Sequence, residues 1–98
     1  MPSLDGAVVL ITGANGGIGT RFVEEALARG AAKVYATART PREWADERVV
    51  PLRLDVTDAE SIRAVVEAAP DVTVLINNAG ASVPTAGILT HTLSLIHI

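Results

Sequence analysis

Apolar and polar positions alternate along this chain in blocks whose lengths suit strands and helices in turn. Four stretches of five or six residues are apolar enough, and short enough, to be strands of a sheet that is buried on both faces. They cover residues 7–12, 33–38, 50–54 and 72–76. These stretches predict four strands, and the segments between them decide how the strands are connected.

Two of those segments have helical periodicity. Residues 17–29 carry apolar side chains three and four positions apart, which predicts one buried stripe formed by Ile18, Phe22, Val23, Ala26 and Leu27. Gly30 follows at the position where a left-handed C-terminal cap is expected. Thr57 and Glu60 have the spacing of a capping box and predict a second helix that runs to residue 69. Residues 41–47 predict a short helical turn.

The resulting order is βαβαβαβ. Strands that alternate with helices form parallel sheets with right-handed crossovers. We therefore predict an α/β fold, the N-terminal half of a Rossmann-like doubly wound parallel sheet, in residues 1–92.

The loop after the first strand is the strongest candidate for chemistry. Residues 12–19 read Thr-Gly-Ala-Asn-Gly-Gly-Ile-Gly and lead directly into the first predicted helix. Glycines allow a tight turn and a close backbone approach to a pyrophosphate, and a helix N-terminus offers free N–H groups. This order favours a dinucleotide-binding crevice. The alternative is a connection that is rich in glycine and binds nothing.

Composition limits the classes of binding partner that we expect. The chain of 98 residues has a net charge of −3, which argues against a nucleic-acid or anionic-membrane surface. It has no cysteine, and its two histidines have no metal-ligand spacing, so we expect no metal site. No apolar run approaches the length of a membrane span, and the N-terminus lacks the pattern of a signal peptide. We expect a cytoplasmic protein.

The glycine loop and the block Asn77-Asn78-Ala79-Gly80 together resemble the short-chain dehydrogenase/reductase family. The glycine pattern alone also fits the extended epimerase/dehydratase branch, whereas the Asn-Asn-Ala-Gly block favours the shorter dehydrogenase branch. The resemblance implies an oxidoreductase that acts on a carbonyl or hydroxyl group, in a parent protein that is a homo-oligomer. A non-catalytic NADP(H)-binding or redox-sensing module is the alternative, and the small-molecule substrate stays open.

The resemblance also implies which residues bind the cofactor. Gly13, Gly17 and Gly19 would provide the turn, the close approach and the helix–strand packing. Arg39 follows the second strand, where NAD-binding proteins place a carboxylate, so its guanidinium favours the 2′-phosphate of NADP over NAD. The alternative for Arg39 is a solvated arginine at the end of a strand. The alternative for Asp55 is a residue that ends the third strand or caps the following helix. The remaining predicted contacts are Asn15, Ile18, Asp55, Val56, Asn78, Ala79 and Gly80.

The family's catalytic residues have no counterpart in this chain. A serine, a tyrosine and a lysine three positions after that tyrosine are needed, whereas Lys33 precedes Tyr35 by two positions. Residues 93–98 show no helix or strand pattern and resemble a translated adapter sequence from DNA library preparation. We therefore expect a non-native tail on an inactive fragment, whose fourth strand would be left as an unpaired edge.

Overall fold

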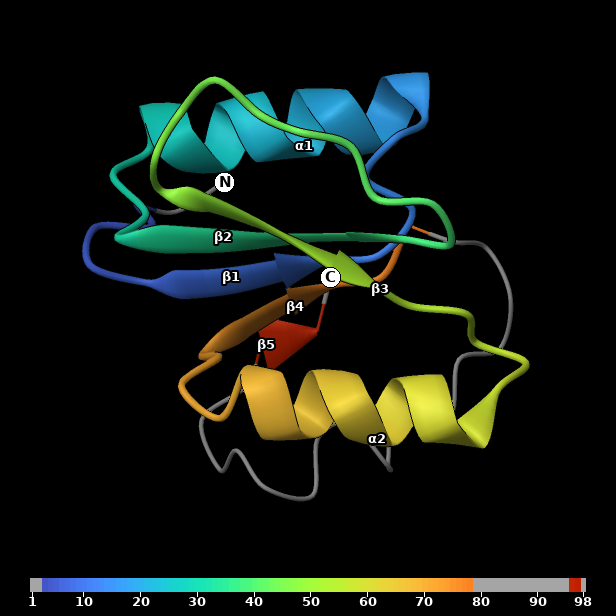
Figure 1. The fold of residues 1–98 in the computed structure, drawn as a ribbon. Coiled ribbons are helices and arrows are strands. Elements are labelled where there is room, and N and C mark those ends of the chain that lie inside the picture. The colour runs from blue at the N-terminus through green and yellow to red at the C-terminus, as the bar shows by residue number, and fades with distance from the viewer. Residues whose placement is uncertain (1–2, 79–95, 98) are drawn as a thin grey trace.

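The computed structural model describes residues 3–78 and 96–97 of the chain. Its elements are β1 (Val8–Ile11), α1 (Gly17–Ala28), β2 (Lys33–Ala38), β3 (Val49–Arg53), α2 (Ala59–Ala68), β4 (Val74–Ile76) and β5 (Ile96–His97). The strands are parallel and form one sheet in the order β3-β2-β1-β4-β5, with α1 on one face and α2 on the other (Figure 1). The predicted half of a doubly wound sheet is therefore confirmed.

The strand pleat divides the core into two clusters, one under each helix. In β1, Val9 and Ile11 belong to the cluster under α1, whereas Leu10 belongs to the cluster under α2. β4 repeats this alternation: Val74 and Ile76 lie on the α1 side, and Leu75 lies on the α2 side. Because successive side chains of a strand point to opposite faces, these apolar strands can hold a helix on each side.

α1 ends as its sequence predicts. Gly30 has a φ of 93°, and its N–H donates to the Leu27 carbonyl at 3.1 Å. The N–H of Ala31 donates to the Ala26 carbonyl, also at 3.1 Å. These two bonds form a Schellman motif, in which a glycine at the left-handed position satisfies the last carbonyls of the helix. The turn returns the chain to the sheet at β2.

The apolar stripe of α1 differs from the prediction at its first residue. Ile18 is 66% exposed, and the buried residues of the helix are Gly19, Val23 and Ala26. Phe22 and Leu27 are partly buried against the same cluster. Gly19 packs against the Gly13 carbonyl, and consecutive helical residues are about 100° apart around the axis, so Ile18 turns away from the sheet.

Two local predictions are wrong. Residues 41–47 contain no helical turn, because Trp44 packs against the α1-side core and Asp46 accepts hydrogen bonds from the backbone and side chain of Arg48. The N-cap of α2 is Asp58, whose side chain accepts from the Glu60 N–H at 3.0 Å. Thr57 precedes the cap, and its hydroxyl donates to Asp55 at 2.6 Å.

β4 is not an unpaired edge. β5 pairs with it in parallel, with Val74 opposite Ile96 and Leu75 opposite His97. The prediction that residues 93–98 lack strand structure is thus wrong at residues 96–97, because parallel pairing depends on backbone N–H and C=O groups and does not require an apolar pattern of side chains. That the tail is non-native stays a prediction.

Candidate functional site

A cleft of about 490 Å³ lies at the carboxyl ends of β1, β2 and β3. Parallel strands bring their carboxyl ends to one edge of the sheet, where the following loops form the walls of a crevice. The residues around it are Thr12, Gly13, Asn15, Ala38, Arg39, Thr40, Leu54, Asp55, Val56 and Thr57. The cleft therefore brings together five of the predicted contacts, namely Gly13, Asn15, Arg39, Asp55 and Val56.

The glycine loop beside this cleft has two positions that require glycine, Gly13 and Gly19. Gly13 has a φ of 65°, which most residues with a side chain avoid. A Cβ atom at Gly19 would lie 2.1 Å from the Gly13 carbonyl oxygen, so a side chain there would push the helix off the loop. Both positions need glycine because of the protein's own geometry, with no ligand involved.

Gly17 differs from these two glycines. A Cβ atom built there meets no heavy atom within 4 Å, so protein packing does not demand glycine at this position. Gly17 begins α1, and its N-cap residue, Gly16, has no side chain to accept the first N–H groups of the helix. Open space in front of uncapped amides and a positive helix end suits a phosphate group.

Thr12 joins the glycine loop to the end of β4. Thr12 is buried, with 1% of its surface exposed. Its hydroxyl donates to Asn77 Oδ1 at 3.0 Å and accepts from the Asn78 N–H at 2.8 Å. The Asn78 side-chain amide then donates to the Gly13 carbonyl at 3.2 Å. Asn77 and Asn78 therefore hold β4 and the glycine loop in one arrangement. Ala79 and Gly80, also predicted contacts, lie outside the described residues.

Charge is distributed unevenly over the cleft walls. Arg39 is exposed, and no described residue forms an ion pair or hydrogen bond with its guanidinium. Asp55 follows β3, the strand next to β2, and hydrogen bonds from the Thr57 hydroxyl and N–H lower the pKa of its carboxyl group, with a smaller contribution from the charges of Arg53 and Arg39. The two charges could bind complementary parts of one ligand, an anion at Arg39 and a hydrogen-bond donor at Asp55.

Sequence reasoning missed the other residues that line the cleft. Thr40 and Thr57 each lie one position beyond a predicted contact, Ala38 is the last residue of β2, and Leu54 follows β3. Their proximity to strand ends was the available signal. Gly17, Ile18 and Gly19 begin α1 and do not line the cleft itself.

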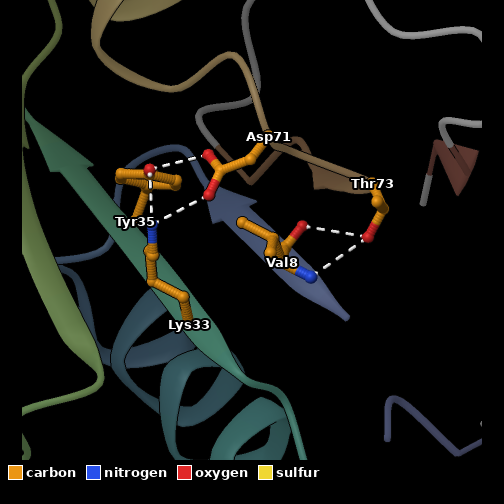
Figure 2. A network of polar contacts seen from close by, with 5 residues as sticks. All are labelled: Val8, Lys33, Tyr35, Asp71 and Thr73. Atoms are coloured by element: carbon orange, nitrogen blue, oxygen red, sulfur yellow. Dashed lines mark hydrogen bonds and ion pairs between the residues drawn. The ribbon is translucent and has the colours of Figure 1, made fainter. Parts of the chain in front are cut away.

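The opposite edge of the sheet holds a second polar group, shown in Figure 2. Tyr35 donates to Asp71 at 2.8 Å, and Lys33 lies 2.8 Å from the same carboxylate and 3.1 Å from the tyrosine oxygen. Burial, followed by the bond to Asp71, raises the pKa of Tyr35. A catalytic tyrosine needs a lowered pKa, so this pair does not replace the missing catalytic residues.

Other classes of site find no support in the described residues. Residues 3–78 contain no group of three histidines, cysteines or carboxylates placed to hold a metal ion. Neither α1 nor α2 is long and apolar enough to cross a bilayer.

Comparison with known proteins agrees with this architecture. The short chain dehydrogenase family matches residues 7–94. The NADP-dependent 3-hydroxy acid dehydrogenase of Schizosaccharomyces pombe is 41% identical over 99 residues, covering 87% of this chain and 38% of the relative. The chain therefore spans little more than a third of that relative's length.

Two solved structures share the fold. A short chain dehydrogenase from Burkholderia cenocepacia, in complex with NADP, has 42% identity and a TM-score of 0.73, over 81% of this chain and 33% of that one. A short chain dehydrogenase from Leptospira borgpetersenii with bound NAD+ has 25% identity and a TM-score of 0.65, over 74% and 31%. The fold and the family match therefore agree, and this chain belongs to the short-chain dehydrogenase/reductase family.

Proposed function

We propose that this chain is the cofactor-binding part of an NADP(H)-dependent oxidoreductase that acts on a carbonyl or hydroxyl group. The cofactor would supply or accept a hydride. The described residues would bind its adenosine half, and the substrate and proton-transfer groups would belong to the remainder of the parent protein. Relatives with NADP and with NAD+ both exist, so the preference has to be argued from this cleft.

The observation that carries the proposal is the guanidinium of Arg39 beside the cleft, which forms no hydrogen bond or ion pair with residues 3–78. It follows Ala38, the last residue of β2, where a carboxylate would be expected to bind the ribose 2′-hydroxyl of NAD. A guanidinium can instead donate two hydrogen bonds to a phosphate. Arg39 at this position therefore favours a 2′-phosphate.

The other residues fit the rest of the adenosine half. The uncapped start of α1 at Gly17 suits the pyrophosphate, and the carboxylate of Asp55 can accept a hydrogen bond from the adenine amino group. Val56 lines the cleft next to it and offers an apolar surface to the ring. These contacts hold and orient the cofactor, and they move no proton.

Binding of two small nucleotides tests the proposal on the 98-residue chain. Adenosine 2′,5′-bisphosphate has the 2′-phosphate and 5′-AMP lacks it, so calorimetric titration should show tighter binding of the bisphosphate. Arg39→Ala should lower the affinity for the bisphosphate about 10-fold and leave the affinity for 5′-AMP unchanged. Arg63→Ala is the matched control, because Arg63 pairs with Glu60 on α2. Equal affinity of the wild type for both nucleotides would contradict the proposal.

A further inference from the structure

The connection between β2 and β3 forms the Arg39 side of the cleft, yet residues 39–48 contain neither helix nor strand. Side chains hold this segment in place. Trp44 packs against the α1-side core, and Arg48 lies near the C-terminal end of α1, 3.4 Å from the Leu27 carbonyl. These two anchors are remote from Arg39, so the part of the segment beside the cleft depends on other contacts.

The contact nearest to Arg39 comes from the glycine loop. Asn15 donates from its side-chain amide to the Thr40 carbonyl at 2.6 Å, across 25 positions of sequence. Asn15 and Thr40 both line the cleft, and Arg39 lies between Thr40 and the end of β2. On the other side of Arg39, the Ala38 carbonyl accepts from the Leu54 N–H at 2.9 Å. The backbone of Arg39 is therefore fixed at both of its neighbours.

A second set of contacts holds the segment farther along. The guanidinium of Arg42 lies 3.6 Å from the centre of the Trp44 ring and donates to the Thr20 hydroxyl at 3.3 Å. That hydroxyl donates in turn to the Ala14 carbonyl at 3.0 Å. Loss of the Asn15 amide would thus leave residues 42–48 attached to α1. It would release the segment only next to Arg39.

We infer that Asn15 is a positioning residue that determines cofactor preference, because its amide holds the Thr40 carbonyl and thereby directs Arg39 to the 2′-phosphate. The inference rests on the proposed function and assigns Asn15 a role different from direct contact with the cofactor. A direct contact to the pyrophosphate or ribose would strengthen binding of all adenosine nucleotides equally. A positioning role strengthens only the binding of those that reach Arg39.

The ratio of the two nucleotide affinities separates these roles. In Asn15→Ala, the preference for adenosine 2′,5′-bisphosphate over 5′-AMP should fall about 3- to 10-fold, the size expected for loss of one hydrogen bond. The affinity for 5′-AMP should stay within about 2-fold of the wild type. Asn15→Ser should behave like Asn15→Ala, because the serine side chain is too short to reach the Thr40 carbonyl. Asn15 is exposed, so circular dichroism should show both variants folded.

Thr57→Ala is the matched control from the loop that follows β3. Thr57 holds the Asp55 carboxylate through two hydrogen bonds and, among the described residues, forms none with residues 39–48, so its loss should weaken the binding of both nucleotides equally and leave the ratio unchanged. A wild-type preference that survives in both Asn15 variants would overturn the inference alone. An equal loss of affinity for both nucleotides in Asn15→Ala would also overturn the inference. A wild type without preference would overturn the proposed function first.

Discussion

At the amino edge of the sheet, Lys33, Tyr35 and Asp71 form hydrogen bonds with one another, whereas the Arg39 side chain at the carboxyl edge forms no hydrogen bond or ion pair with a described residue. Lys33 begins β2 and Arg39 follows its last residue, so the two groups lie at opposite ends of this strand. Tyr35 is buried, and buried polar groups need partners, so the amino edge is the arrangement expected of a structural network. The carboxyl edge combines an unpaired cation with uncapped amides at the start of α1, which is the arrangement expected of a ligand site.

The two edges also use threonine differently at the two ends of the β1–β4 pair. Thr73 holds the amino end, because its hydroxyl accepts from the Val8 N–H at 3.1 Å and donates to the Val8 carbonyl at 3.3 Å (Figure 2). The Thr73 N–H donates to the same carbonyl at 2.8 Å. Thr12 fastens the carboxyl end through Asn77 and Asn78. The bonds of Thr73 hold the amino ends of β1 and β4 together, and the bonds of Thr12 hold the glycine loop beside the end of β4.

The largest effect should come from Gly19→Ala at the carboxyl edge. The new methyl group would collide with the Gly13 carbonyl, and we expect a loss of roughly 3 kcal/mol or more in the free energy of unfolding, because backbone atoms cannot move aside. Urea denaturation followed by circular dichroism measures this loss.

Gly17→Ala is the control for that variant. Its methyl group meets open space, so stability should be unchanged or higher by up to about 1 kcal/mol, since alanine favours the helix. Binding of 5′-AMP should nevertheless weaken, because the methyl group lies before the amides that would hold its phosphate. Retention of full affinity would mean that the start of α1 is no phosphate site.

A smaller effect should distinguish the two threonines. Thr12→Val leaves the Asn78 N–H without its partner and should cost about 1–3 kcal/mol, with weaker binding of both nucleotides. Thr73→Val should cost about 1 kcal/mol and leave nucleotide affinity unchanged, because the change lies at the other edge. Chemical denaturation and calorimetry measure the two properties. Equal loss of affinity in both variants would show that the edges are not independent.

The smallest effect is the acid response of the amino edge. Hydrogen bonding from Lys33 holds the pKa of Asp71 below its usual value. The folded state therefore binds fewer protons at Asp71 than the unfolded chain, and the stabilisation is complete above the unfolded pKa of about 4. It is lost as pH falls through the lower, folded pKa.

Asp71→Asn isolates this contribution from other carboxylates, such as Asp46, whose pKa is lowered to about 2 by its hydrogen bonds with Arg48. Thermal melts between pH 6 and about pH 3 should show a smaller decrease in Tm for the variant than for the wild type. Asp71 is exposed, so the difference should be slight. Parallel decreases in the two proteins would remove Asp71 from the acid response.

Much of the fold could be predicted from local pattern. The bounds of β2 match the prediction, β1 is one residue shorter at each end, and Gly30 forms the predicted cap. Predictions were wrong where a nearby partner competed for a group. Thr57 donates to Asp55, and Asp58 caps the helix instead. Trp44 packs against the core, and the predicted helical turn does not form.

By itself, the sequence determined the alternation of strands and helices, the glycine positions and the presence of Arg39 after the second strand, because these depend on local spacing and backbone conformation. Only the tertiary structure decided which polar groups meet. Asn15 reaches Thr40 across 25 positions, and Tyr35 reaches Asp71 across 36. Such contacts depend on how the parallel strands align and where the loops return, which periodicity does not encode. For that reason the tertiary structure was needed to distinguish Lys33, Tyr35 and Asp71, which bond to one another, from Arg39, which forms no hydrogen bond or ion pair with a described residue.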